Sequence, residues 1–218
     1  MTGHEIQKKR IGNILIKIDS VLDDLKPDAL LILGDTNSCL SAIAAKKKKI
    51  PIFHYEAGNR CFDQRVPEEI NRKIVDHLSD INMPLSEQAR DYLIAEGIKP
   101  ETIIKTGSPM MEVLNANMQK ILDSKILEKE NLKKNGYILM SIHREENVDS
   151  ERNFSQLLES IETISSVYKM PIIISTHPRT RKKLEEIEYD KKNKFLSFSK
   201  PYGFHEYINL QLNAFCVI

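Results

Sequence analysis

The stretch PDALLILGDT, residues 27–36, sets the fold class of this chain. Its apolar run over residues 29–33 lies between Pro27 and Gly34, which both interrupt regular structure. A short apolar run without alternating polar residues is typical of a strand buried in a parallel sheet. In such sheets ligands bind beyond the carboxyl ends of the strands, so the polar residues after Gly34 become candidates for a site.

Helix and strand patterns alternate on both sides of this stretch. Apolar residues recur at helical spacing over residues 11–25, which predicts an amphipathic helix that ends before Pro27. Downstream, the patterns predict helices over residues 37–48, 68–78 and 87–96 and strands over residues 51–55, 81–83 and 103–105. Gly97 follows the last of these helices and is placed to cap it. This alternation predicts an α/β fold in which helices cover both faces of a parallel sheet.

The alternation stops in a polar segment and then resumes. Residues 117–135 are rich in Lys, Glu and Asn and contain no core strand, so we expect a junction built on a polar helix. Beyond it, strands are expected over residues 137–141, 171–175, 195–198 and 215–218, with helices over residues 153–167, 180–188 and 204–212. The predicted domains are therefore residues 1–117 and 136–218, joined by a helical junction at 118–135.

Both domains are expected to be incomplete. The chain opens on a helix with no strand before it, and it stops inside the apolar run over residues 214–218, where a domain rarely ends. Because ligands sit beyond the ends of such strands, we expect the chain to stop where a site should begin.

Composition limits the classes of function. The 218 residues are 41% hydrophobic and 29% charged, which is typical of a globular protein with a core. A formal net charge of +1 gives no field that would favour nucleic acid or an anionic membrane. The three cysteines are odd in number and far apart, and the sequence has neither a signal peptide nor an apolar run long enough to span a membrane. We therefore expect a cytoplasmic protein.

Charged residues follow the first two predicted strands. After the first, Thr36 is suited to cap the next helix, and Asp35 is either a structural cap or a functional acid. The second leads into HYEAGNR, residues 54–60, which crowds an imidazole, a carboxylate and a guanidinium at one strand end. Such charges are costly to bury unless they are paired or used. Glu56 is thus a candidate functional acid, and an ion pair with Arg60 is the alternative.

Further polar motifs open a helix and follow strands of the second domain. PEEINR, residues 67–72, begins with Pro and two acids and places Glu68 and Arg72 four residues apart on one helix face. An ordinary N-terminal charge pattern would explain this motif as well. His143 and Arg144 follow one predicted strand and His177 follows the next, so each is either functional or simply hydrogen-bonded at a strand end.

Several common catalytic motifs are absent from the sequence. There is no H-E-x-x-H, and His54 and Glu56 are too isolated to form a metal ligand set. There is also no G-x-G pair for a dinucleotide, no G-K-[ST] phosphate loop and no G-x-S-x-G nucleophile elbow. We therefore expect neither a metal nor a nicotinamide cofactor.

Five motifs in order resemble the non-hydrolysing UDP-N-acetylglucosamine 2-epimerase family. They are GDT at 34–36, HYEAGNR at 54–60, PEEINR at 67–72, TGSP at 106–109 and HREEN at 143–147. The resemblance covers nearly the whole chain and implies a GT-B-like architecture, two Rossmann-like parallel-sheet domains facing across a cleft. It also implies a UDP-sugar as the ligand and no cofactor, and a homodimer is kept as the candidate assembly.

The resemblance implies a mechanism and a set of site residues. In this family the proton at C2 is removed and UDP is expelled, which leaves a 2-acetamidoglycal, and UDP then adds back after protonation on the other face. By motif position, the catalytic residues are Asp35, Glu56, Glu68, His143 and Arg72. The substrate-binding residues are His177, Arg144, Arg60 and Thr36.

Some features depart from the family pattern. The loop over residues 59–66 lacks the usual Leu before Arg60 and the usual Trp before PEE, and this variant resembles the branch that forms UDP-N-acetyl-L-fucosamine. The family's N-terminal strand and its basic loop, and a Ser-Gly-Gly…Glu-Glu segment, are absent from the residues given, so we expect little or no turnover from these 218 residues alone. The alternatives are a GT-B glycosyltransferase, a non-catalytic nucleotide-sugar-binding fragment and a hydrolysing epimerase.

Overall fold

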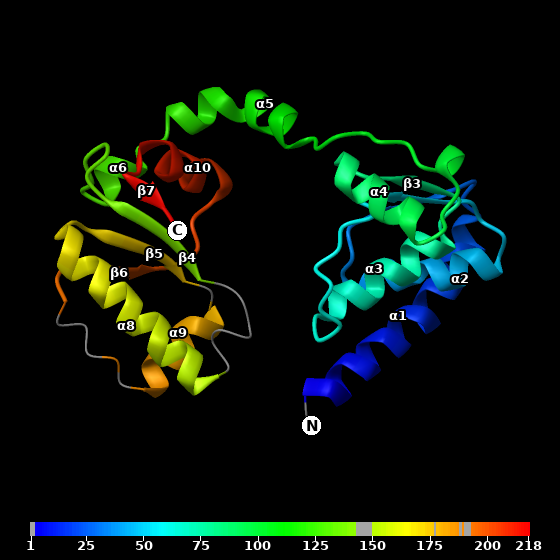
Figure 1. The fold of residues 1–218 in the computed structure, drawn as a ribbon, viewed down its shortest axis with the longest axis horizontal. Helices are drawn as coiled ribbons and strands as arrows, with labels where there is room; N and C mark the ends of the chain where they lie inside the picture. The colour runs from blue at the N-terminus through cyan, green and yellow to red at the C-terminus, as the bar shows by residue number, and fades with distance from the viewer. Residues whose placement is uncertain (1–2, 143–149, 177, 188, 190–192) are drawn as a thin grey trace. The chain divides into compact units, whose positions relative to one another are not determined.

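The structure, a computed structural model, describes residues 3–142, 150–176, 178–187, 189 and 193–218 (Figure 1). These residues form two compact units, Met1–Met110 (unit 1) and Met111–Ile218 (unit 2). Each unit holds one parallel β-sheet with helices packed on it. In the described part of the chain, no helix has both the length and the apolar character needed to cross a membrane.

Unit 1 is built on a three-stranded parallel sheet in the order β1-β2-β3. Its strands are β1 (Leu30–Leu33), β2 (Ile52–Tyr55) and β3 (Ile81–Met83). The helices between and around them are α1 (Gly3–Leu25), η1 (Asn37–Leu40), α2 (Ser41–Lys47), α3 (Pro67–Leu78), α4 (Glu87–Ala95) and η2 (Pro100–Thr102). The predicted alternation is therefore present in this unit, and Gly97 follows α4 with the positive φ of a helix C-cap.

The core of unit 1 lies on one face of its sheet. Ile32 of β1 and Ile52 of β2 are buried among side chains of α1, η1, α2 and α3, and these include Leu22, Leu40 and Val75. Removing that apolar surface from water is the main favourable term that holds these helices on the sheet.

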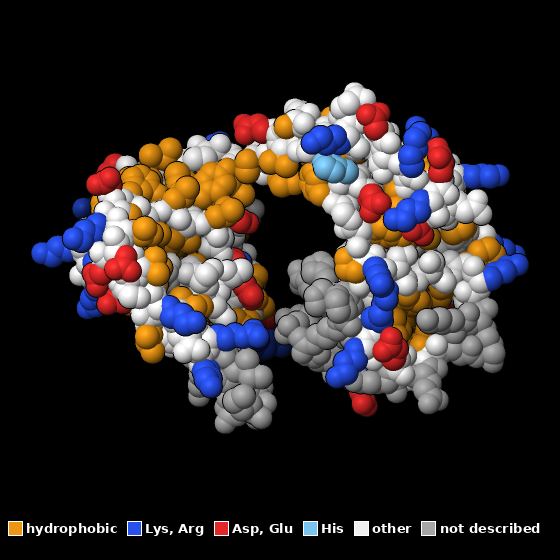
Figure 2. All heavy atoms as spheres, turned by 180° about the vertical axis from the view of Figure 1, so that it is seen from behind, with side chains coloured by type: hydrophobic (Ala, Val, Ile, Leu, Met, Phe, Trp, Pro, Cys, Tyr) orange, Lys and Arg blue, Asp and Glu red, His pale blue; other side chains and the backbone are white. Residues whose placement is uncertain are grey.

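Three details of unit 1 differ from the sequence prediction. The first strand is not buried on both faces, since Leu31 is 67% and Leu33 70% exposed while Ile32 is buried. The helices pack only on the Ile32 side of β1, and hydrophobic side chains gather at the surface of this unit (Figure 2). The strand expected over residues 103–105 is a single bridge from Ile103 to Asn82, and the helix expected over residues 37–48 begins as the 3₁₀ turn η1.

Unit 2 is built on a four-stranded parallel sheet in the order β6-β5-β4-β7. Its strands are β4 (Ile138–Ile142), β5 (Ile172–Thr176), β6 (Leu196–Ser199) and β7 (Cys216–Val217). Its helices are α5 (Met110–Leu122), α6 (Ile126–Lys129), α8 (Glu151–Tyr168), α9 (Pro178–Glu186) and α10 (Phe204–Asn213). This order agrees with the second alternating segment of the sequence.

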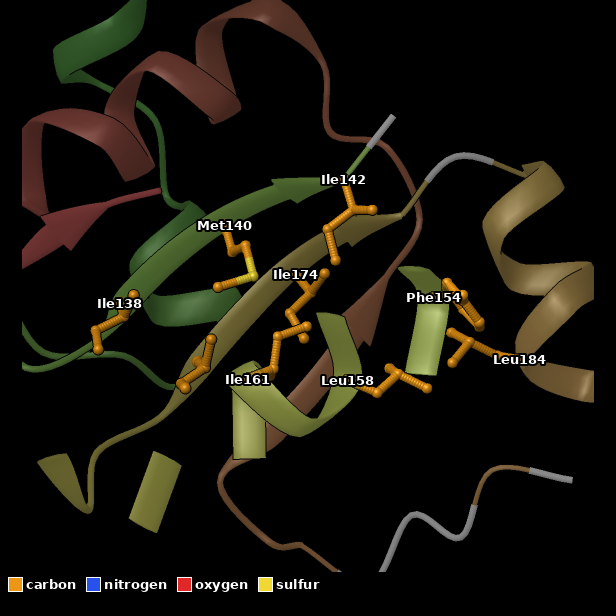
Figure 3. Close-up of a cluster of buried hydrophobic side chains, with 9 residues drawn as sticks. Ile138, Met140, Ile142, Phe154, Leu158, Ile161, Ile174 and Leu184 are labelled. Carbon is orange, nitrogen blue, oxygen red and sulfur yellow. The ribbon is translucent and has the colours of Figure 1, made fainter. Parts of the chain in front are cut away.

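Helices cover both faces of the sheet in unit 2. Alternate residues of β4 and β5 point toward α8 and α9, where Phe154, Leu158, Ile161 and Leu184 complete one core cluster (Figure 3). The intervening residues Leu139 and Ile173 face the other way and pack with Ile126 of α6 and Leu210 of α10. This two-faced burial explains why β4 and β5 are nearly continuous apolar runs.

The segment predicted as a polar junction contains the end of α5 and all of α6. Two of its apolar residues, Ile121 and Ile126, are fully buried. Asn209 of α10 donates a hydrogen bond of 2.8 Å to the carbonyl of Ile121, so the end of α5 is fixed to unit 2. The predicted domain limits at residues 117 and 136 stay a prediction.

The three thiols differ in environment, and this predicts their reactivity. Cys39 is 3% exposed in η1, and burial, with the charges of Asp35 and Asp76, raises its pKa to about 12. Cys61 and Cys216 are exposed. Since the thiolate is the reactive species, we expect a disulfide reagent to label Cys61 and Cys216 in the native protein and Cys39 only after unfolding. Labelling followed by peptide mass spectrometry measures this, and native labelling of Cys39 at the rate of Cys61 would contradict it.

Candidate functional site

The carboxyl ends of β1 and β2 lie side by side in unit 1. Leu33 pairs with Tyr55 in the parallel register, and the Gly34 amide donates to the Tyr55 carbonyl at 3.1 Å. A Cβ placed on Gly34 would lie 3.5 Å from Glu56 Oε2, so the Glu56 carboxylate lies against the turn that carries Asp35. The two predicted acids therefore occupy neighbouring strand ends, as open parallel sheets place their ligand sites.

Asp35 is held by an arginine from α3. Arg72 donates from Nε, at 2.8 Å, and from Nη2 to one and the same oxygen, Asp35 Oδ2. The Asn71 amide donates to the Asp35 backbone carbonyl at 2.9 Å. Oδ1 has no hydrogen bond to the described residues, and the side chain is 24% exposed. Asp35 is therefore not a helix cap but an oriented carboxylate with one oxygen available to a ligand.

Glu68 and Arg72 lie four residues apart on α3 as expected, but the acid that pairs with Arg72 is Glu69. Arg72 Nη1 lies 3.0 Å from Glu69 Oε2, whose side chain is fully buried. Glu68 is exposed and makes no hydrogen bond or ion pair to the described part of the chain. Positions three and four residues apart both neighbour each other on a helix, and burial selects the nearer one here.

Glu69 stays ionised although it is buried. Burial alone would raise its pKa, but hydrogen bonds from the amide and thiol of Cys61 and the charge of Arg72 outweigh that effect and lower the pKa. The cation of Arg72 is thus shared between a buried carboxylate and the partly exposed carboxylate of Asp35.

Glu56 adopts a backbone conformation that is unusual for its residue type. Its φ is +72°, in the left-handed region, and its amide donates to the Met83 carbonyl at 3.1 Å. Such strain costs on the order of 1–3 kcal/mol and is concentrated at functional sites. Its Oε1 accepts a long hydrogen bond of 3.4 Å from the Asn59 amide, and no ion pair joins it to Arg60 among the described contacts. The described contacts therefore do not include the ion pair with Arg60 that was the alternative to a functional role for Glu56.

Two of the predicted substrate-binding residues, Arg60 and Thr36, lie in the described part of unit 1. The Arg60 side chain is fully buried and bonds to Glu96 through Nε at 2.8 Å and Nη2 at 2.6 Å, and to Asp76 through Nη1 at 2.8 Å. These contacts give Arg60 a structural role in unit 1, and its predicted role in substrate binding stays a prediction. Thr36 occupies the N-cap position of η1 and is exposed, but its hydroxyl pairs with Ser38 at 2.8 Å and makes no capping bond.

The remaining predictions concern residues that lie outside the described ranges. They are His143, Arg144 and His177. Their roles stay predictions. Within the ranges that are described, no group of three or more His, Cys, Asp or Glu side chains is arranged to hold a metal ion.

Sequence reasoning missed the buried partners of the site. Glu69 stands next to the predicted Glu68, and the helix spacing alone favoured neither. His54 was part of a quoted motif but was not assigned a role, and its partner Asp76 lies 22 residues away in sequence. The packing of α3 against β2 brings His54 and Asp76 together.

Comparison with known proteins supports the family that the motifs suggested. A family model described as UDP-N-acetylglucosamine 2-epimerase matches residues 2–218. The chain belongs to the UDP-N-acetylglucosamine 2-epimerase family. A relative of that name from Methanocaldococcus jannaschii is 37% identical over 225 aligned positions, which cover 97% of this chain and 60% of the relative.

Solved structures of the family share the fold. One of UDP-N-acetylglucosamine 2-epimerase from Rickettsia bellii has a TM-score of 0.90 and 53% identity, over 96% of this chain and 55% of that one. The M. jannaschii epimerase in complex with UDP-GlcNAc and UDP has a TM-score of 0.88 and 35% identity, over 97% and 60%. The chain thus spans a little over half the length of these epimerases. The likeness confirms the predicted α/β, GT-B-like fold class.

Proposed function

We propose that the full-length protein containing this sequence is a non-hydrolysing UDP-N-acetylhexosamine 2-epimerase. The observation that carries the proposal is the pair of carboxylates, Asp35 and Glu56, at adjacent strand ends in a member of this family. Both side chains are partly exposed, and one of them is oriented by an arginine. The substrate would be a UDP-sugar with an acetamido group at C2.

The proposed reaction needs proton transfer at C2 and departure of UDP from C1. A carboxylate takes the C2 proton, the C1–O bond to UDP breaks, and a C1–C2 double bond forms. Protonation of C2 on the opposite face and return of UDP to C1 give the epimer. A positioned acid or base contributes about 10²–10⁴-fold to such a step. Arg72 fixes the direction of the Asp35 carboxyl group through two charge-assisted bonds.

We also propose a substrate branch, a pathway and an assembly for this enzyme. The loop over residues 59–66 favours the branch that forms UDP-N-acetyl-L-fucosamine, and parallel assays with UDP-N-acetylglucosamine and the L-talo sugar would separate the two substrates. Precursor synthesis for capsule or O-antigen in the cytoplasm, by a homodimer, would fit such an enzyme. Sedimentation analysis measures the assembly.

Incubation with the UDP-sugar in heavy water tests the reaction. We expect the full-length protein to place deuterium at C2 of both epimers, because protonation of the glycal takes its hydrogen from solvent. NMR spectroscopy detects this as loss of the C2 proton signal. Transfer of the sugar to an acceptor without C2 exchange would indicate a glycosyltransferase, and free sugar plus UDP a hydrolysing epimerase. Tight UDP binding with none of these products would indicate a non-catalytic nucleotide-sugar-binding protein.

A further inference from the structure

Beneath the two site carboxylates lies a fully buried aspartate, Asp76 of α3. Its Oδ1 is 2.7 Å from His54 Nδ1, and its Oδ2 is 2.8 Å from Arg60 Nη1. The Gly58 amide lies 3.2–3.3 Å from both oxygens. The side chains of Asp76, His54 and Arg60 are all 0% exposed. None of these buried side chains is open to a substrate in this structure. The groups that contact the Asp76 carboxylate nevertheless all belong to residues 54–60, the segment that carries Glu56.

The protons of His54 follow from its contacts. Nε2 lies 3.1 Å from the Gly34 carbonyl, and a carbonyl oxygen only accepts, so Nε2 carries a proton. Nδ1 lies 2.7 Å from Asp76 Oδ1, and Arg60 contacts the other oxygen of the same carboxyl group. Both ring nitrogens of His54 are thus engaged, one with the Gly34 carbonyl and one with Asp76. Arg60 is the cation that pairs with both Asp76 and Glu96, as a buried carboxylate such as Asp76 requires.

The buried cluster of Asp76, His54 and Arg60 connects the two turns that carry the site acids. Through His54, Asp76 fixes the Gly34 carbonyl, and the next residue is Asp35. Through the Gly58 amide it fixes the turn that begins at Glu56 in its left-handed conformation. A strained turn persists only where its surroundings over-determine it, and the bond from the Gly58 amide to Asp76 is one of those restraints.

We propose that Asp76 and His54 are positioning residues that hold Asp35 and Glu56 in register for proton transfer. This inference rests on the proposed function. A merely structural role would be served as well by apolar side chains, since buried ion pairs are often replaceable without loss of stability. These ion pairs can instead position the site acids, and position matters because a misplacement of a reacting group by about 1 Å costs about 10²-fold in rate.

Two substitutions and the double variant that combines them separate a positioning role from an effect on stability. In Asp76→Asn, the amide can donate to a neutral His54 and still accept from Arg60 and Gly58, so the fold is retained while the charge is lost. In His54→Gln, the amide nitrogen can keep the Gly34 contact but loses Asp76. We expect each to lower kcat by about 10–100-fold with KM changed by less than about threefold. The double variant should be no slower than the worse single one, because both break the same chain of contacts.

The control is Asp80→Asn in the same unit. Asp80 accepts from the amide of Ile52, at the amino end of β2 and away from the site, at 2.9 Å. It also pairs with Lys46. We expect this variant to lose stability but to keep kcat within about twofold, since surface pairs do not orient the acids.

NMR of 15N-histidine-labelled protein gives a readout that needs no activity. The wild type should show an Nε2–H proton for His54 that is protected from exchange, identified by its absence in His54→Gln, and Asp76→Asn should shift its resonance. An unprotonated or freely exchanging Nε2 in the wild type would overturn the proposal even if the variants fail to fold. Unchanged kcat in both folded variants would overturn it while the epimerase function stands. Absence of epimerase activity in the wild type would refute the proposed function instead, and the positioning role with it.

Discussion

Asp35→Asn is expected to lower kcat of the full-length protein by about 10²–10⁴-fold, because an amide neither takes nor returns the C2 proton. The fold should survive. The Asn carbonyl oxygen can accept both bonds that Arg72 now donates to Asp35 Oδ2, and Asn71 still holds the backbone carbonyl. The deuterium assay in heavy water measures the rate, and thermal unfolding checks the fold. If the variant keeps a third of the wild-type rate, Asp35 is not a catalytic residue.

Asp63→Asn is the matched control for this loss. Asp63 also binds an arginine through Nε and Nη2, in this case Arg65, and that pairing lowers the pKa of its carboxyl to about 2. The pair is a contact between near neighbours in a surface loop, and such pairs contribute little. We expect the rate to stay within about twofold of wild type. Equal losses in both variants would point to a general effect of charge and not to chemistry at Asp35.

The fold was predictable where local patterns decide it. Proline and glycine mark the limits of β1, and the change from helical spacing to short apolar runs recurs through both units. Burial of a particular face was not predictable. Leu31 and Leu33 belong to the same apolar run as Ile32, and only the side on which α1 and α2 pack distinguishes them. The run therefore indicated a strand but not its exposure.

The site was predictable in part, and for a related reason. Strand ends in a parallel sheet converge, so the sequence alone indicates that Asp35 and Glu56 lie at the same edge of the sheet. The partner of Arg72 was not predictable, because Glu68 and Glu69 are both within reach on a helix and burial alone selects between them. Arg60 pairs with Asp76, which is distant from it in sequence. The burial of this ion pair was not predictable, because the motif that contains Arg60 is also typical of a ligand-binding loop.

Gly58→Ala is expected to destabilise unit 1 by about 2–4 kcal/mol, from backbone strain together with overpacking. The φ of Gly58 is +78°, and an added Cβ would lie 2.4 Å from the Ala89 carbonyl oxygen and 2.9 Å from Leu93 Cγ. Helix α4 would have to move away from the turn, and the Gly58 amide would then lose its bonds to Asp76. Cys39 provides the measurement, because its thiol lies in the core of unit 1 and should react only when the unit opens. A penalty of this size raises the rate of Cys39 labelling by about 30–800-fold, at 1.4 kcal/mol per factor of ten.

Gly97→Ala separates the two causes of that penalty. Gly97 has a φ of +89°, similar to that of Gly58, but nothing lies within 4 Å of the position of its Cβ. This variant therefore carries only the conformational cost, about 1–2 kcal/mol, and should raise Cys39 labelling much less. If both variants label Cys39 at the same rate, the close approach of α4 is not what requires glycine at position 58. If Gly58→Ala is the faster by tenfold or more, the packing of α4 against the Glu56 turn is itself a source of the geometry of the site.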